Sequence, residues 1–398
     1  MVRKVRMGII GGGLESFMGR IHLEAIKQSG ELDVVCGAFG STRHNSFAAA
    51  KHLRLPVRRS YGSYRDMFRR EVTLPEDTRM EFVSVLAPNG MHYPVSMSAA
   101  DSGFPVLCEK PMSCTLAEAT NLVRKLRQSG NVPYGVSFTF GGYPMLLRAQ
   151  KMIQHEKALG NIRRVNATVM VGWMSQRLET AGCRQALWRT DARRCGPAGS
   201  LMDLGVSCFS LTEWLTGLHV SEVCADLKIN VAGRMLDDDS AVLVRFEEGG
   251  RGTFICSQVA AGCHQGATIE VYGEKGSLRW EQSAPDRLVF CDLSLNQEVY
   301  TGGIPATERD EAQVRAQGPY GNNDAYIAAL AETYRSFATL IRDPGQAAAE
   351  SPAFGSVDEG LRSIVFVDAV IRNMTALGDG LPQLKWTPFV LPPIPELL

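Results

Sequence analysis

The sequence predicts an α/β protein with two domains: an N-terminal domain built on a doubly wound parallel sheet, and a C-terminal α/β domain whose sheet is mostly antiparallel. Over roughly the first 140 residues strands alternate with helical segments, which is typical of parallel sheets. From about residue 160 the strands alternate apolar with polar residues and are joined by short turns, which favours antiparallel pairing. Because 398 residues exceed most single cores, we place the domains at residues 1–142 and 143–398.

The N-terminal domain begins with a short apolar strand, VRMGII at residues 5–10, followed by a glycine-rich turn and a helix at 16–30. A capping box, Thr115 with Glu118, opens a later amphipathic helix that runs to about residue 130. The other predicted elements of this domain are strands at 32–40, 81–88, 105–111 and 132–140, a helix ending near 55 and a helix at 92–103.

The C-terminal domain contains long runs with the period of two that half-buried strands show. The tetrapeptides EEGG (247–250) and GEKG (273–276) are predicted hairpin turns. Two helices complete the domain, and the proline-rich tail at 391–398 is expected to lie extended. The predicted strands lie within 163–173, 220–233, 240–260, 267–282 and 286–293, and the helices at 322–343 and 356–374.

Charge and composition exclude several classes of protein. Forty-two basic residues balance forty-two acidic ones, so there is no electrostatic case for a nucleic-acid or membrane-surface partner. No apolar run approaches the roughly 18 residues of a membrane span, and the apolar start is too short for a signal peptide. The ten cysteines show neither a C-x-x-C pair nor zinc spacing, which favours reduced thiols and a cytoplasmic protein.

The turn after the first strand has the context of a dinucleotide-binding fingerprint. In GIIGGGLESFMGRIH (8–22), Gly11 and Gly13 lie between a strand and a helix, where glycine lets the backbone approach a pyrophosphate. The third glycine, Gly19, comes five residues after Gly13, which is irregular. We expect a nicotinamide cofactor here, with Phe17 at the start of the helix beside it, although a purely structural turn remains the alternative.

The end of the second strand carries no acid of the kind that holds the adenosine ribose in NAD-specific sites. Ser41 and Arg43 stand there instead and would suit a 2′-phosphate, which favours NADP over NAD. Arg43 as a solvated loop residue is an equally open interpretation, so the cofactor is predicted only as NAD or NADP.

Two further segments end predicted parallel strands, at the edge where open α/β sheets bind ligands. CEKP (108–111) contributes Glu109 and Lys110, and APNGMH (87–92) contributes Asn89 and His92. Taken alone, a lysine before a proline carries little information, and a lone histidine is more often structural than catalytic.

The glycine turn, APNGMHY, CEKP and the WRTD…GSLMDLG region (188–205) together resemble the Gfo/Idh/MocA family of oxidoreductases, over about residues 5–375. The resemblance implies a Rossmann domain followed by a domain with an open-faced sheet often used for oligomer contacts, hence a homodimer or homotetramer. It also implies hydride exchange between NAD or NADP and a hydroxyl-bearing carbon of a sugar, glycoside, sugar derivative or cyclitol.

On this resemblance Lys110 is the catalytic lysine, Glu109, Asn89 and His92 lie near the cofactor, and Asp203 matches the acid of a D-x-G-x-H segment. Oxidising an alcohol needs a base, and an amine with a lowered pKa can serve. We expect Asp203 to be a site carboxylate paired in space with Lys110. A helix carboxylate satisfied by backbone donors is the alternative.

The family's usual histidine, four residues after that acid, is Ser207 here. Three explanations stay open. Lys110 with Asp203 suffices and Ser207 only bonds or relays a proton; a tyrosine such as Tyr143 handles the proton; or redox activity is lost and the chain is a cofactor-binding sensor or regulator.

On the substrate side, Trp188 and Arg189 would suit sugar stacking and hydroxyl or carboxylate binding, with Trp173 a weaker candidate; each could equally belong to the core. The acid run LDDDS (236–240) is expected to be a solvated turn, and no metal is assigned. Cys195 and Cys208 are expected to be small buried hydrophobes.

Overall fold

The computed structural model describes residues 3–40, 42–130, 132–263, 266–302, 323–347, 352–375 and 385–394. These residues form two compact units. Unit 1 comprises the described residues within Met1–Gly142, Ile327–Leu361 and Pro392–Leu398, and unit 2 those within Tyr143–Tyr326 and Arg362–Leu391. The chain therefore returns to unit 1 after unit 2 has begun, and each unit is described by itself.

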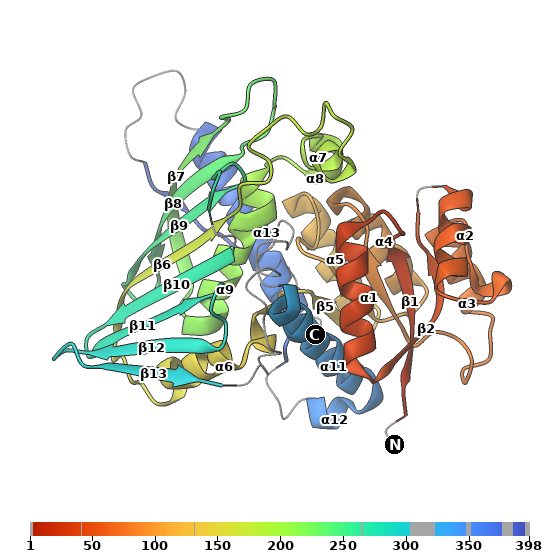
Figure 1. Cartoon of the computed structure of the whole chain (residues 1–398), viewed down its shortest axis with the longest axis horizontal. Coiled ribbons are helices and arrows are strands. Elements are labelled where there is room, and N and C mark those ends of the chain that lie inside the picture. The colour runs from red at the N-terminus through yellow and green to blue at the C-terminus, as the bar shows by residue number, and fades with distance from the viewer. Residues whose placement is uncertain are drawn as a thin grey trace. The chain divides into compact units, whose positions relative to one another are not determined.

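Unit 1 has a five-stranded parallel sheet in the order β2-β1-β3-β4-β5 (Figure 1), which confirms the predicted doubly wound Rossmann fold. The strand order reverses direction at β1 and β3, and ligands of such sheets bind outside the carboxyl ends of the strands at this point. The strands are β1 Val5–Gly11, β2 Leu32–Ala38, β3 Phe82–Leu86, β4 Val106–Cys108 and β5 Tyr134–Val136. The helices are α1 Phe17–Ser29, α2 Arg43–His52, α3 Tyr64–Glu71, α4 His92–Asp101, α5 Leu116–Gln128, α11 Asn323–Arg342 and α12 Pro344–Ala347, with 3₁₀ turns at Val57–Arg59, Asn89–Met91 and Thr139–Gly142.

The core of unit 1 combines the sheet with a helix from far along the chain. Every residue of β3 is buried, which fits an apolar strand covered on both faces. On α11, the ring of Phe337 lies 5.1 Å from that of Phe82 and 5.2 Å from that of Phe354. The capping box of Thr115 and Glu118 forms at the start of α5 as predicted.

Unit 2 has a nine-stranded sheet in the order β13-β12-β11-β10-β6-β9-β8-β7-β14 (Figure 1). Among the strands that the structure describes in this sheet, only β6 and β9 pair in parallel, so the prediction of a mostly antiparallel sheet is confirmed. The strands are β6 Ile162–Met170, β7 Val220–Lys228, β8 Asp239–Phe246, β9 Arg251–Ser257, β10 Gly266–Gly273, β11 Gly276–Glu281, β12 Arg287–Asp292, β13 Gln297–Thr301 and β14 Thr387–Pro388. The helices are α6 Pro144–Gln150, α7 Arg184–Arg189, α8 Ala192–Cys195, α9 Val206–Thr216 and α13 Val357–Thr375, with single π-helical turns at Lys151–His155 and Leu201–Gly205.

The two faces of this sheet differ in what covers them. Helix α9 packs against β6 and β9, and α6 packs against β11 and β12. Along β8, buried residues such as Val242 and Val244 alternate with the exposed Leu243. This is the half-buried pattern predicted from the alternation in the sequence.

The acid run before β8 is not a solvated turn, contrary to the prediction. Asp237 and Asp238 are 7% and 1% exposed. Both carboxylates are buried because backbone N–H groups and a guanidinium surround them, which is the condition for burying a charge.

All ten cysteines are free, and Cys195 and Cys208 are fully buried, as expected for small apolar residues. In the part of the chain that the structure describes, no helix has both the length and the apolar character to span a membrane.

Candidate active site

The glycine turn joins the carboxyl end of β1 to α1. Gly11 has φ +86°, a left-handed conformation, and a Cβ there would lie 2.6 Å from the backbone nitrogen of Ala87. A Cβ on Gly19 would collide with the carbonyl of Gly12, so the irregularly spaced third glycine is the one that lets α1 approach the turn. Ser16 caps α1 by accepting from the Gly19 N–H at 3.0 Å. The bare turn against a helix N-terminus fits a dinucleotide pyrophosphate.

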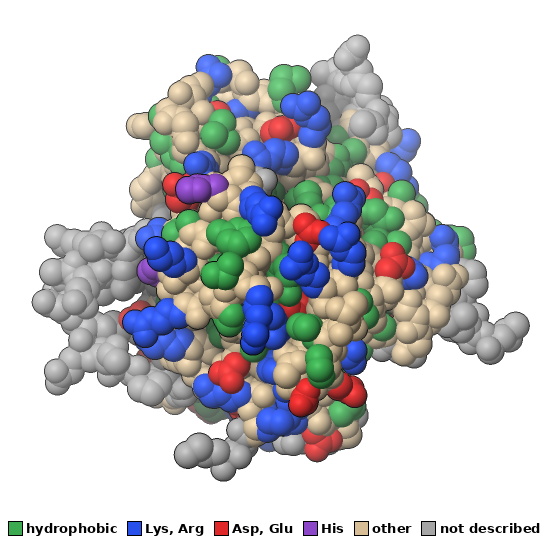
Figure 2. All heavy atoms as spheres, turned by 90° about the vertical axis from the view of Figure 1, so that its right-hand side faces the viewer, with side chains coloured by type: hydrophobic (Ala, Val, Ile, Leu, Met, Phe, Trp, Pro, Cys, Tyr) green, Lys and Arg blue, Asp and Glu red, His purple; other side chains and the backbone are tan. Residues whose placement is uncertain are grey.

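The end of β2 leads to Arg43, the first residue of α2. Its guanidinium lies 5.3 Å from the centre of the Phe47 ring, and its side chain is exposed. Figure 2 looks onto the side of the molecule where α2 and α3 lie and shows many Lys and Arg side chains over this face. Ser41, predicted as its neighbour at the cofactor, lies outside the described residues.

Two loops meet at the carboxyl ends of β3 and β4. Asn89, in the 3₁₀ turn after β3, is buried. His92 begins α4 and is 1% exposed, and its two ring nitrogens face backbone carbonyls: Nδ1 lies 2.6 Å from Pro111 O and Nε2 lies 2.8 Å from Ala87 O. The ring thus bridges the loop that carries Asn89 and the loop that carries Lys110.

Glu109 follows β4 directly, and its N–H donates to Val85 O at 3.0 Å. Its carboxylate Oε1 lies 3.1 Å from Nε2 of His22 on α1, although the two groups are not aligned as a hydrogen bond. Burial alone would raise the pKa of Glu109, but the His22 ring and the charges of Lys110 and His92 outweigh it and lower that pKa. Lys110, next in the chain, is half-buried.

The other nitrogen of His22 leads deeper into unit 1. Its Nδ1 lies 2.8 Å from the Tyr334 hydroxyl, which in turn lies 3.0 Å from the Ser84 hydroxyl on β3. A hydrogen-bonded chain therefore runs from Ser84 on β3 through Tyr334 on α11 to His22 on α1, whose other ring nitrogen lies 3.1 Å from the Glu109 carboxylate.

In unit 2, the Asp203 carboxylate accepts hydrogen bonds from two side chains. Nε of Arg189 and Nε2 of Gln258 both donate to its Oδ2 at 3.0 Å. Asp203 is buried in the π-helical turn before α9, and such turns occur frequently at functional sites. Arg189 thus provides the charge partner that burial of the carboxylate demands.

Both predicted tryptophans lie beside the same arginine. The Arg189 guanidinium is 4.1 Å from the centre of the Trp188 ring and 5.6 Å from that of Trp173, within cation–π range. The indole N–H of Trp173 is buried without a hydrogen-bond partner among the described residues. Unit 2 therefore brings Trp173, Trp188, Arg189 and Asp203 together, while Ser207 lies half-buried in the first turn of α9.

The buried acid run holds the segment that carries Asp203. The Asp237 carboxylate accepts from the N–H groups of Gly199 at 2.6 Å and Leu201 at 2.8 Å. Asp238 accepts from the N–H groups of Asn230 at 2.8 Å and Val231 at 3.0 Å, while the N–H of Gln258 donates to Asp238 O. Burial raises the pKa of Asp237, against its backbone donors.

Tyr143 lies in the core of unit 2, 1% exposed. Its hydroxyl accepts from Nε2 of Gln282 at 3.0 Å, and its ring packs edge-on against Trp280. Burial raises the pKa of Tyr143 far above its usual value. The phenol is therefore strongly held in its protonated form.

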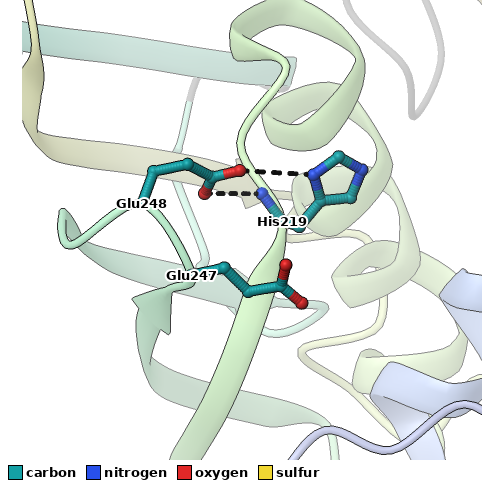
Figure 3. Close-up of side chains that lie close together, drawn as sticks. All are labelled: His219, Glu247 and Glu248. Carbon is teal, nitrogen blue, oxygen red and sulfur yellow. Dashed lines mark hydrogen bonds and ion pairs between the residues drawn. The ribbon is translucent and has the colours of Figure 1, made fainter.

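A third cluster lies at the edge of unit 2, where His219, Glu247 and Glu248 come close together (Figure 3). All three are exposed. The Glu248 carboxylate accepts from the His219 backbone N–H at 3.2 Å, and its other oxygen lies 3.4 Å from Nδ1 of the His219 ring. This pairing accounts for the cluster without a cation, and we assign no metal to it.

Sequence reasoning did not identify His22, Tyr334, Gln258 or Asp237. His22 lies in the helix that follows the glycine turn. Helical spacing from the apolar residues of that helix could have indicated that His22 is on its buried face. The other three carry no local signal, because each acts through a partner distant in sequence.

Comparisons with known proteins agree with this architecture. Residues 5–138 match the oxidoreductase family with an NAD-binding Rossmann fold, and residues 146–279 match the GFO/IDH/MocA C-terminal domain. The chain is 26% identical to the uncharacterized oxidoreductase YfiI of Bacillus subtilis over 377 residues, 93% of this chain and 95% of the relative. Levoglucosan dehydrogenase of Pseudarthrobacter phenanthrenivorans is 23% identical over 94% of this chain and 96% of its own.

Among solved structures, an inositol dehydrogenase homolog from Azotobacter vinelandii complexed with NAD+ is similar, with a TM-score of 0.84. It is 26% identical, and the alignment covers 97% of this chain and 98% of that one. Since both halves of the chain match one family in the right order, the chain belongs to the GFO/IDH/MocA family of NAD-binding oxidoreductases.

Proposed function

We propose that this enzyme exchanges a hydride between NAD or NADP and a hydroxyl-bearing carbon of a sugar, glycoside, sugar derivative or cyclitol, with Lys110 as the acid/base and Asp203 assisting. The observation that carries the proposal is the position of Lys110 after β4, at the same sheet edge as the glycine turn after β1. The names of the inositol and levoglucosan dehydrogenase relatives support the substrate class.

The roles of the residues follow from their chemistry. The cofactor, when bound, supplies the hydride acceptor or donor. The glycine turn and the first turn of α1 bind its pyrophosphate, and Asn89 and Glu109 orient its nicotinamide end. The Lys110 amine takes the hydroxyl proton in oxidation and returns it in reduction, a contribution of about 10²–10⁴ to the rate.

In unit 2, Asp203 with Arg189 forms the polar part of a substrate-binding surface, and the tryptophan rings form the apolar part. A pyranose or cyclitol presents both hydroxyls and an apolar C–H face, which suits this combination. Ser207 supplies a hydroxyl for hydrogen bonding to the substrate. Because Tyr143 is buried and already bonded, it has less support as the proton-handling group.

We further propose that the protein forms a homodimer or homotetramer through the outer face of the unit 2 sheet. The strand register puts four exposed apolar side chains on that face: Leu243, Ile255, Tyr272 and Val299. Light scattering coupled to size exclusion should give a multiple of 43.5 kDa, and Leu243→Lys with Ile255→Lys should lower it.

A cofactor-binding sensor without turnover is the second candidate, because Ser207 replaces the histidine usual in the family. The deciding experiment follows reduced-nicotinamide absorbance with NAD and with NADP over a panel that includes myo-inositol and levoglucosan. Turnover that Lys110→Ala lowers at least 100-fold, and that a Lys125→Ala control on α5 leaves unchanged, would support the dehydrogenase. Cofactor binding with no turnover on any member of the panel would favour the sensor.

A further inference from the structure

The two ring nitrogens of His92 both face hydrogen-bond acceptors, and a neutral histidine can donate to only one of them. Its ring is 1% exposed, and both nitrogens lie within hydrogen-bond distance of carbonyl oxygens, 2.6 Å from Pro111 and 2.8 Å from Ala87. A carbonyl can only accept. A neutral imidazole has one N–H, so one of its nitrogens would direct a lone pair at a buried carbonyl; an imidazolium donates to both.

The surroundings of the ring support the charged form. Burial disfavours a charged ring, but Cys108 on β4 and the two carbonyls outweigh it and raise the pKa of His92 to about 9. The nearby carboxylate is Glu109, whose pKa the His92 charge helps to lower. From β5, Tyr134 reaches Ser96 on α4 at 3.4 Å, and from α5, Lys125 pairs with Asp101 at the other end of α4.

We propose that His92 is a positioning residue that stays protonated at neutral pH and, as an imidazolium, clamps the Glu109–Lys110–Pro111 segment to the end of β3. The clamp joins the backbone just after Lys110 to the backbone just before Asn89. It therefore holds together the two loops that carry the proposed catalytic and cofactor-binding groups.

The charge has a second consequence, which rests on the proposed function. We infer that the imidazolium, held 2.6 Å from the carbonyl of the residue after Lys110, opposes protonation of the Lys110 amine, and a base must be unprotonated to accept the hydroxyl proton. His92 thus favours the form of Lys110 that oxidation requires.

His22 on the other side of Glu109 provides a contrast. Its partners are a hydroxyl, which can donate or accept, and a carboxylate, which accepts. The Tyr334 hydroxyl can donate to Nδ1 or accept from it, so the hydrogen bond of His22 does not require an N–H on both ring nitrogens. His92 and His22, which lie on either side of Glu109, therefore differ: both partners of His92 can only accept, whereas the hydroxyl partner of His22 can also donate.

The first test needs neither substrate nor cofactor. The ring nitrogens of the seven histidines are labelled with ¹⁵N in the full chain, and the His92 signals are identified by their loss in His92→Gln. Exposed His44 and His52 serve as references for rings in contact with water. We expect both His92 nitrogens to carry protons at pH 7.5 and to lose one only as the pH approaches about 9. A singly protonated His92 ring at pH 7.5 would overturn the proposal.

The second test compares two variants in the dehydrogenase assay. His92→Gln keeps amide donors without the charge, and His92→Leu removes both. We expect the acid limb of the kcat–pH profile to move to higher pH in both, and His92→Leu to lose a further roughly tenfold to hundredfold in kcat through misplacement of Lys110. An unchanged profile in folded His92→Gln would refute the electrostatic role. Absence of turnover in the unmodified enzyme would refute the proposed function while leaving the NMR result to decide on His92.

Discussion

The ion pair between Arg189 and Asp203 gives a prediction whose size can be worked from the structure. The side chains are 6% and 8% exposed, and Nε lies 3.0 Å from Oδ2. Removing one partner of such a buried pair typically destabilises a protein by about 3–5 kcal/mol, because the other charge stays buried. Gln258 still donates to Asp203 in Arg189→Met, so we expect a loss near the lower end, about 3 kcal/mol.

Equilibrium urea unfolding, followed by far-UV circular dichroism, measures this loss. A double-mutant cycle adds Asp203→Asn and the variant that carries both changes. In that double variant no unpaired Asp203 carboxylate remains buried. We expect the double variant to be more stable than the sum of the single changes implies, with a coupling energy of about 2 kcal/mol. An exposed pair in the same unit, Arg372 with Asp368 at 48% and 34% exposure, is the matched control and should give about 0.3–0.5 kcal/mol.

The reasoning would be refuted by a coupling energy for Arg189 and Asp203 no larger than that of the exposed control. That result would mean that water molecules, and not the Arg189 guanidinium, hydrogen-bond the Asp203 carboxylate, and that the pair is exposed to solvent.

Three further predictions concern stability and cofactor binding. Asp237→Asn replaces one of the two acceptor oxygens by an amide NH2, which would face a backbone N–H that it cannot bond. The unfolding free energy should fall by about 1–3 kcal/mol in urea unfolding, and no loss would mean that the loop is hydrated. Gly19→Ala should force α1 away from the Gly12 carbonyl and weaken NAD binding in calorimetry at least tenfold. Gly30→Ala at the other end of α1 should lower stability because φ there is +73°, but its Cβ meets nothing and the affinity should stay unchanged. Because the pKa of His92 is raised from 6.5 to about 9 in the folded state, its protonation should add about 3 kcal/mol to the unfolding free energy. This contribution should be full below about pH 6.5 and lost as the pH rises through about 9. The unfolding free energies of the wild type and His92→Gln should therefore differ at pH 7 and converge at pH 9.5.

The positions of the candidate site residues that lie at strand ends could be predicted from the sequence. Gly11 ends an apolar strand of the parallel sheet, Asn89 and Lys110 follow two others, and parallel strands bring their carboxyl ends to one edge. The glycine pattern was informative even at irregular spacing. Gly19 allows helix α1 to approach the turn from its first turn, whatever its distance from Gly13 in the sequence.

The pairing of charged side chains could not be predicted in the same way. Asp203 stands in an apolar run, and its partner Arg189 lies in a short helix, α7, with no periodic relation to it. Gln258 follows the last residue of β9, where nothing in the local pattern separates an amide that bonds Asp203 from one that faces solvent. Such pairs arise from the register of a sheet with helices above it, which is a property of the whole unit.

The acid run shows why local charge density is an unreliable guide to exposure. Consecutive carboxylates repel one another in an isolated segment, and the simplest way to relieve that repulsion is to place them in water. In the folded unit, Asp237 faces the N–H groups of the turn before Asp203, and Asp238 faces the N–H groups of a neighbouring loop and the guanidinium of Arg234. Each carboxylate replaces its water with fixed donors, so the segment that carries Asp203 is positioned by a loop beyond α9 and β7. A substitution in that loop should therefore alter the site as well as the stability of the unit.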